Sequence, residues 1–183
     1  VFEGGVIAIV AAVCAINVDA YVHLAGATVE LASGDDGVHA DLQLVVSAGD
    51  LTITESVEGL ESGEIVIAGG ATDVTASDDG LNVSEPDSGT AAQALLISGG
   101  ILLVDAGGDG LDVNSGSLTQ TGGTVVVSGP TDNGNGALDA DGGVTISGGT
   151  LVALGSSGMA MAPAASSAQA TVQFALSQAA VAG

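Results

Sequence analysis

Carboxylates recur beside small residues along most of this chain, at a spacing that could hold cations. The stretch SDDGLNV (77–83) has near-copies at 34–40 (GDDGVHA), 56–62 (SVEGLES) and 107–113 (GGDGLDV). Each copy places an acidic residue before a glycine and a second polar residue two positions after it. Ca²⁺ prefers oxygen ligands and accepts about six to eight of them in flexible geometry. The pattern therefore predicts cation binding, provided that the fold brings the copies together.

The polar residues form three columns when the copies are aligned on the glycine. They lie one before it (Asp36, Glu58, Asp79, Asp109), two after it (His39, Glu61, Asn82, Asp112, Asp139) and four after it (Asp19, Asp41, Asn114, Asp141). We name these columns the acidic stripe. The predicted Ca²⁺ ligands within it are Asp36, Glu58, Asp79, Asp109, Glu61, Asp112, Asp139 and Asp141.

A repeat of 21 to 22 residues is predicted to position the stripe. The glycine-like anchor recurs in steps of 22, 22, 21, 30, 27 and 21 residues, and a second small pair, usually Gly-Gly, keeps a similar period. Between these markers, aliphatic residues alternate with polar ones in three short segments per repeat, which is typical of half-buried strands. Gly at the anchor permits a turn with positive φ.

The period predicts an all-β fold, a single right-handed parallel β-helix (solenoid) of about seven coils with three short strands each. Equivalent strands would stack about 4.8 Å apart. An antiparallel β-sandwich is the alternative, but it predicts hairpin turns and no fixed period.

The coils are predicted to occupy residues 1–161, with loop insertions at 84–92 and 129–135. Residues 162–183 are predicted to form a linker (162–170) and a capping strand (171–177, TVQFALS). The apolar stretch at 6–16 lacks a basic flank and fits the repeat, so we interpret it as a first coil rather than a targeting segment. Its open edge predicts either preceding protein or end-to-end association with a neighbour.

Charge restricts the partners. The chain has 22 acidic residues, no Lys or Arg and a formal net charge of −22. Nucleic-acid binding needs cationic side chains and is excluded, docking to anionic lipid is disfavoured for the same reason, and no membrane insertion is expected. Stacked carboxylates repel by about 1 kcal/mol per pair in water and more when buried. Divalent cations would relieve this repulsion, whereas a solvated acidic face is the alternative explanation.

Catalytic interpretations are weaker. Acid pairs such as Asp109 and Asp112 can hydrolyse glycosides, but any acidic β-helix offers such pairs. No Ser or Cys forms a recognisable triad motif with His23 or His39, although His39 with neighbouring Asp residues is an alternative metal site. Thr52 and Thr54 resemble part of an ice-binding array, but the face is irregular. We therefore expect no enzymatic activity.

Two long segments resemble a known family. They are VVVSGPTDNGNGALDADGGVTISGGTLVALGSSGMAMAP (125–163) and SSAQATVQFALSQAAVAG (166–183). Both resemble the bacterial secreted carbohydrate-binding domain-containing family, which often accompanies spore-coat-type surface proteins. The resemblance implies an extracellular β-helix, suggests glycan binding and carries over no catalytic residue. Ala140 stands where an aromatic is expected.

Together these patterns predict a non-catalytic, structural or binding β-solenoid that is secreted or exposed at the cell surface. Calcium along the acidic stripe is the expected ligand, with end-to-end self-association as a further expectation. The alternative is a module that binds neutral glycan through the loops at 84–92 and 129–135.

Overall fold

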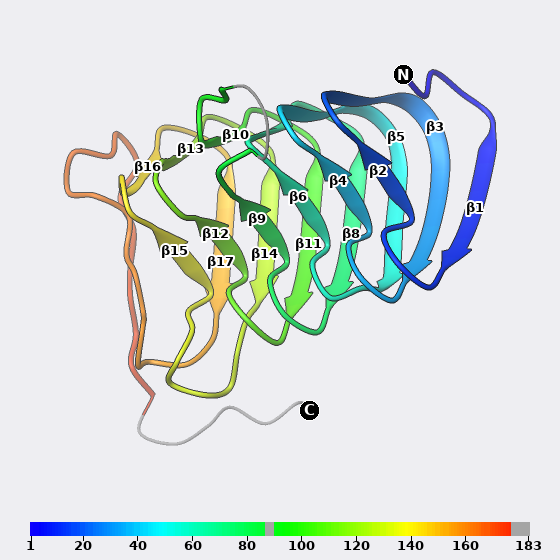
Figure 1. The fold of residues 1–183 in the computed structure, drawn as a ribbon. Helices are drawn as coiled ribbons and strands as arrows, with labels where there is room; N and C mark the ends of the chain where they lie inside the picture. Colours follow the sequence, from blue (N-terminus) through cyan, green and yellow to red (C-terminus); the bar gives the residue numbers. More distant parts are fainter. Residues whose placement is uncertain (87–89, 177–183) are drawn as a thin grey trace.

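The chain folds into a parallel β-solenoid. The structure, a computed structural model, describes residues 1–86 and 90–176, which contain 17 strands and no helix. The strands stack side by side along one axis, and the chain advances by one coil at a time (Figure 1). Every strand pairing is parallel, so the antiparallel sandwich is excluded.

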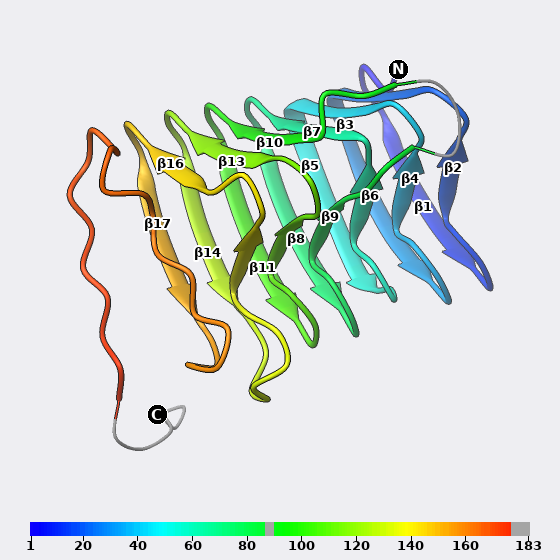
Figure 2. The ribbon, with the colours of Figure 1, turned by 60° about the vertical axis from the view of Figure 1, so that its left-hand side comes forward.

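Each coil contributes to three faces, as the second view shows (Figure 2). The first face is a six-stranded sheet of β2 (Ile16–Val18), β4 (Val38–Ala40), β6 (Leu60–Ser62), β9 (Leu81–Val83), β12 (Leu111–Val113) and β15 (Leu138–Ala140). The second face contains the first parts of β3 (Tyr21–Ser33) and β5 (Gln43–Glu55), then β7 (Glu64–Ile67), β10 (Ala94–Ile97), β13 (Ser117–Gln120) and β16 (Val144–Ile146).

The third face contains β1 (Val6–Ala11), the later parts of β3 and β5, then β8 (Ala71–Ala76), β11 (Ile101–Ala106), β14 (Thr124–Ser128) and β17 (Thr150–Leu154). Because β3 and β5 continue around a corner, the second and third faces form one 11-stranded sheet. The predicted three strands per coil are therefore confirmed.

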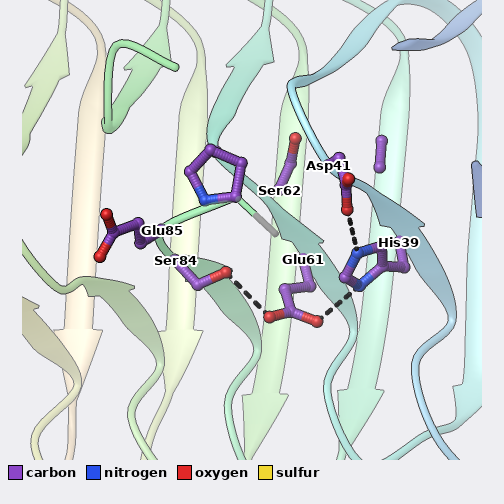
Figure 3. A pocket seen from close by; sticks show the side chains of 9 residues that line it. His39, Asp41, Glu61, Ser62, Ser84 and Glu85 are labelled. Atoms are coloured by element: carbon purple, nitrogen blue, oxygen red, sulfur yellow. Dashed lines mark hydrogen bonds and ion pairs between the residues drawn. The ribbon is translucent and has the colours of Figure 1, made fainter. Parts of the chain in front are cut away.

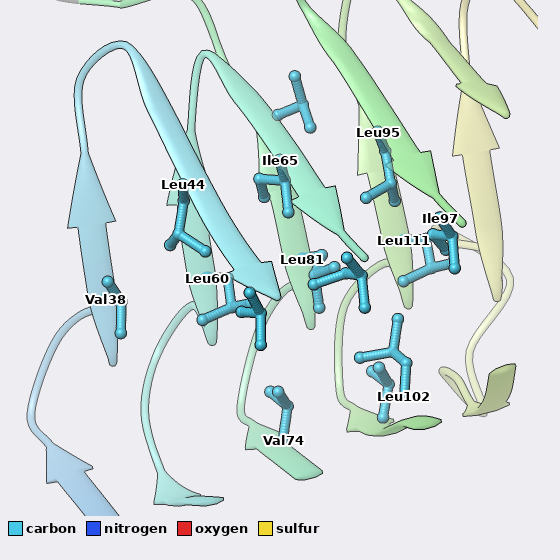
Figure 4. Close-up of a cluster of buried hydrophobic side chains, with 14 of the residues drawn as sticks. Val38, Leu44, Leu60, Ile65, Val74, Leu81, Leu95, Ile97, Leu102 and Leu111 are labelled. Atoms are coloured by element: carbon cyan, nitrogen blue, oxygen red, sulfur yellow. The ribbon is translucent and has the colours of Figure 1, made fainter. Parts of the chain in front are cut away.

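Aliphatic ladders fill the interior. On the first face Leu60 pairs in register with Leu81, which pairs with Leu111, and these three side chains are at most 1% exposed. Neighbouring ladders from the other two faces meet them inside the coil (Figure 4). Stacking in register removes each aliphatic side chain from water without a hairpin or helix. The ladders therefore hold the outward residues between them at fixed positions.

Glycines at two corners have different roles. At the corner of the repeated Gly-Gly pair, the second glycine has a positive φ, for example +78° at Gly70 and Gly100. The anchor glycines do not, so their expected positive φ is wrong. A Cβ at Gly80 would lie 2.2 Å from Val104 Cγ1 and 2.5 Å from the Gly110 carbonyl oxygen. Close approach between coils, rather than backbone conformation, requires glycine there.

The solenoid ends sooner than predicted. The first and second faces have six strands each, so the described chain makes about six turns instead of about seven. Met159 lies in no strand and is 47% exposed. The chain after β17 turns toward the 129–135 loop, where the Ser156 amide donates to the Pro130 carbonyl. The segment follows the course of the preceding coil, with Met161 packed against the core, but it forms no further strand.

The C-terminal end is covered by the predicted linker but not by the predicted capping strand. Residues 171–176 form no strand, and Val172 and Phe174 are 76% and 81% exposed. The predicted capping strand is therefore wrong over these residues, and residue 177 lies outside the described part. Instead, the Ala164 and Gln169 amides donate to carbonyls of β16, at 2.7 and 3.2 Å. The predicted linker therefore covers the edge of β16, and the alternating segment after it pairs with no strand.

Two further findings complete the fold. Residues 129–135 form an exposed loop, as predicted, while the 84–92 insertion is described except for residues 87–89. No helix in the described residues has the length and apolar character needed to cross a membrane.

Candidate functional site

The acidic stripe lies along the outer side of the first face. Its middle column consists of the central residues of consecutive strands, so Asn82 lies between Glu61 and Asp112 in the register. The column before the anchor lies at the preceding corner. The neutral Asn82 separates the stripe into two groups of carboxylates with different chemistry.

The first group, which we name the histidine cluster, comprises Asp36, His39, Asp41 and Glu61. His39 Nδ1 lies 2.7 Å from Glu61 Oε2 and 3.4 Å from Asp36 Oδ2, while Nε2 lies 3.2 Å from Asp41 Oδ1. Figure 3 shows the ring between Glu61 and Asp41, with Ser84 donating to Glu61. The ligand atoms of Asp36, His39 and Glu61 all lie within 4.8 Å of one another.

Burial and charge act in opposite directions on this cluster. Burial alone lowers the pKa of His39, but the hydrogen bonds to Asp41 and Glu61 and the charge of Asp36 outweigh it, so the pKa is raised. Burial raises the pKa of Asp36, with Glu61 and Asp35 adding to the rise. Cys14 Sγ donates to Asp36 Oδ2 at 3.3 Å. Because the chain has no Lys or Arg, His39 is the cationic side chain of this cluster when protonated.

Amide side chains bridge the middle of the stripe. Asn82 Nδ2 donates to Glu58 Oε2 at 2.9 Å, and Asn114 Nδ2 donates to Asn82 Oδ1 at 3.0 Å. Burial raises the pKa of Glu58 to about 7, with the charges of Glu61, Asp36 and Asp79 contributing. Glu58 is therefore a hydrogen-bonded carboxyl between the two groups.

The second group, which we name the aspartate cluster, comprises Asp79, Asp109 and Asp112. Their carboxylate oxygens lie within 4.8 Å of one another. Backbone amides fix two of the three: Asp79 Oδ1 accepts from the Asp109 amide at 2.7 Å, and Asp109 Oδ1 accepts from the Gly136 amide at 2.6 Å. All three side chains are partly buried.

Crowding is severe in the aspartate cluster. Burial raises the pKa of Asp112 to about 7, and the charges of Asp79, Asp109 and Asp139 add to the effect. Burial also raises the pKa of Asp79 to about 6, with Asp78, Asp109 and Asp139 adding to it. The pKa of Asp109 is raised for the same reasons. Neutral carboxyls or a bound cation would both relieve this repulsion.

The predicted ligands thus fall into distinct environments. Asp36 and Glu61 belong to the histidine cluster; Asp79, Asp109 and Asp112 form the aspartate cluster; Glu58 and Asp139 lie beside these groups and Asp141 is exposed. The predicted ligand set omitted His39 and Asp41. Both residues belong to the polar columns, so the sequence pattern indicated them. His39 was omitted because the ligand set was restricted to carboxylates, and Asp41 was omitted although it lies in the column four residues after the anchor.

A hollow lies beside the 129–135 loop. It has a volume of about 350 Å³ and is lined by the ends of β8, β11 and β14 together with Gly129, Pro130 and Thr131. Asp105 is its one charged residue, and none of its lining residues is aromatic. Stacking on a sugar ring, which aromatic side chains favour, has no platform there.

Comparisons with family models, curated proteins and solved structures give no match for this chain. The resemblance to the carbohydrate-binding domain-containing family therefore stays a prediction from the sequence. Any functional argument rests on the stripe and the surfaces around it.

Proposed function

We propose that this chain is a non-catalytic β-solenoid that binds Ca²⁺ at the aspartate cluster. The proposal is supported chiefly by the convergence of Asp79, Asp109 and Asp112 within 4.8 Å of one another. Three hard oxygen donors at this separation suit a Ca²⁺ ion, with carbonyls and water completing the coordination. Ca²⁺ is favoured over the heavier transition metals because the cluster offers no nitrogen or sulfur ligand.

Local rigidity supports the same proposal. The backbone amides of Asp109 and Gly136 already hold two of the carboxylates, so little side-chain freedom is lost when an ion binds. No Lys or Arg exists to neutralise the cluster. A divalent cation therefore removes repulsion that the fold otherwise retains, and it stabilises the coils that supply its ligands.

A calcium site of this kind suits a scaffold that is secreted or displayed at the cell surface. Extracellular Ca²⁺ modules bind weakly, with Kd values of about 10⁻⁴–10⁻³ M. A site with three carboxylates and open positions belongs in that class. Association of solenoids end to end stays a prediction.

The calcium proposal is tested by thermal unfolding, followed by circular dichroism at low salt, with chelator and with added Ca²⁺. Ca²⁺ at ten times its Kd should stabilise the fold by about 1.4 kcal/mol. Asp79→Asn and Asp109→Asn should remove most of this gain. Asp73→Asn is the matched control, because Asp73 is an exposed carboxylate on the third face.

A melting temperature that is indifferent to chelator and to Ca²⁺ would overturn the proposal. An equal loss in the Asp73→Asn variant would do the same, because it would show diffuse screening of the whole chain rather than a site. Neutral-glycan binding is the second candidate, because the hollow beside the 129–135 loop offers a concave surface. Glycan-array binding that depends on this loop and not on Asp79 would favour it.

A further inference from the structure

His39 is surrounded by carboxylates on both sides of its ring. Asp41 faces Nε2, while Glu61 and Asp36 face Nδ1. These residues come from two adjacent coils: His39 is the central residue of β4, and its register partner in β6 is Glu61. The fold therefore aims one imidazole nitrogen and two carboxylates at a common point.

The Asp41 contact is the one that metal-binding histidines usually make. A ligating histidine almost always donates its other ring N–H to a carboxylate, carbonyl or water, which fixes the tautomer and the ring orientation. Asp41 is 9% exposed and accepts from His39 Nε2 at 3.2 Å. Both ring nitrogens therefore face carboxylates, Nε2 toward Asp41 and Nδ1 toward Glu61 and Asp36. An ion bound at Nδ1 would replace the proton there, while the Asp41 contact would keep the Nε2 proton and the ring orientation.

A second observation lies next to the cluster. Ser62 is 2% exposed, and its Oγ has no hydrogen-bond partner among the described residues. Ser62 lines the same small cavity as His39, Asp41 and Glu61, with a volume of about 30 Å³. A cavity of this size and polarity holds about one water molecule. It provides a place for a water on a bound ion, whereas the Ser62 side chain, in register with Ala40 and Val83, faces the interior.

We propose that Asp36, His39 and Glu61 form a site for a borderline transition-metal ion, best matched by Zn²⁺. Zn²⁺ binds imidazole nitrogen at about 2.0–2.1 Å and carboxylate oxygen at about 2.0–2.2 Å. Two such ligands on a tetrahedral ion lie about 3.3 Å apart. The Asp36–His39 separation of 3.4 Å already matches, and the 2.7 Å between Glu61 and His39 needs a small opening.

Glu61 can make that adjustment. Its side chain is 19% exposed and lies at the surface of β6, whereas the Asp36 side chain is 11% exposed. Without metal, a proton on Nδ1 makes the hydrogen bond to Glu61, so the ion must displace that proton. The site shares no residue with the aspartate cluster and differs from it in having a nitrogen ligand. A test of the zinc site is therefore independent of the calcium proposal.

The test is titration of the full chain with ZnCl₂ at pH 8, by isothermal calorimetry and by thermal unfolding. We expect one Zn²⁺ per chain. His39→Asn should weaken binding by at least about tenfold, and Asp41→Asn by about 10- to 100-fold through loss of ring orientation. His23→Asn is the matched control and should bind as the parent does, because His23 contacts Ser47 on the second face.

Unchanged Zn²⁺ affinity in the His39→Asn variant would overturn the assignment, since it would show diffuse binding to acidic residues. Loss of binding in Cys14→Ser with retention in His39→Asn would also overturn it, by moving the site to the thiol. If His39→Asn fails to fold, ¹⁵N spectra of the parent chain decide the question. Zn²⁺ should shift the ring nitrogens of His39 and leave those of His23 unchanged; the reverse, or no shift, refutes the site.

Discussion

Replacing Asp112 with Asn should stabilise this protein at neutral and basic pH. Asp112 lies in the aspartate cluster, where burial and three neighbouring carboxylates raise its pKa to about 7. A carboxyl whose pKa is higher in the folded state than in the unfolded chain favours folding only while it is neutral. Its contribution is therefore complete below about pH 4 and is lost as the pH rises through about 7.

The magnitude follows from the same pKa. A rise from 3.8 to about 7 corresponds to roughly 4 kcal/mol by linkage. Because the side chain is only half-buried, solvent screening reduces this to about 1–2 kcal/mol. Asp112→Asn should raise the free energy of unfolding by that amount at pH 8 and change it little at pH 4. The parent chain should itself become less stable between pH 4 and pH 8.

Urea unfolding followed by circular dichroism, with chelator present to exclude bound cations, measures both effects. Asp73→Asn removes the same charge from the third face and serves as the control. Equal stabilisation by Asp112→Asn and Asp73→Asn at pH 8 would refute the local argument, because only net charge would then matter. A gain for Asp112→Asn that persists undiminished at pH 4 would refute the assignment of its cause to ionisation.

Two further predictions concern the interior. Leu111→Ala should lower the free energy of unfolding by about 2–5 kcal/mol, because Leu111 is 1% exposed and lies between Leu81 and Leu138. Leu103→Ala is the control and should cost much less, because Leu103 is 39% exposed. Equal urea midpoints for the two variants would contradict the ladder. Thr72→Val should raise the free energy of unfolding by about 1 kcal/mol, because Thr72 is 1% exposed and its Oγ1 has no hydrogen-bond partner among the described residues. A lower melting temperature for this variant would show that the hydroxyl does make a hydrogen bond.

Much of the fold could be predicted because its period is visible in residue types. Residues such as Leu60, Leu81 and Leu111 repeat at one offset from the anchor, and a parallel solenoid is the arrangement that stacks them. The same period correctly placed Asp79 and Asp109 near each other. Gln120 occupies an inward column and is buried, although as a polar residue it breaks the aliphatic pattern.

The ends and the ligand geometry could not be predicted in this way. Met159 and Phe174 satisfy the alternation of a strand, but a strand also needs a neighbour with which its backbone pairs, and neither residue pairs with one. The role of His39 depends on which ring nitrogen faces which carboxylate. Column positions specify the neighbours of a side chain, whereas its rotamer and tautomer depend on the packed structure.

Unequal spacing between paired strands has a consequence for how this chain can acquire new surfaces. Leu60 and Leu81 are 21 residues apart, Leu81 and Leu111 are 30 apart, and both pairs keep the same register. Lengthening a flexible connection by this ratio adds only about 0.3 kcal/mol of closure entropy. Corners of the solenoid can therefore gain residues at almost no thermodynamic penalty, while a single residue added within a strand would turn its aliphatic side chains outward. Variation in length should accumulate at corners, where novel recognition loops can evolve on an unchanged frame.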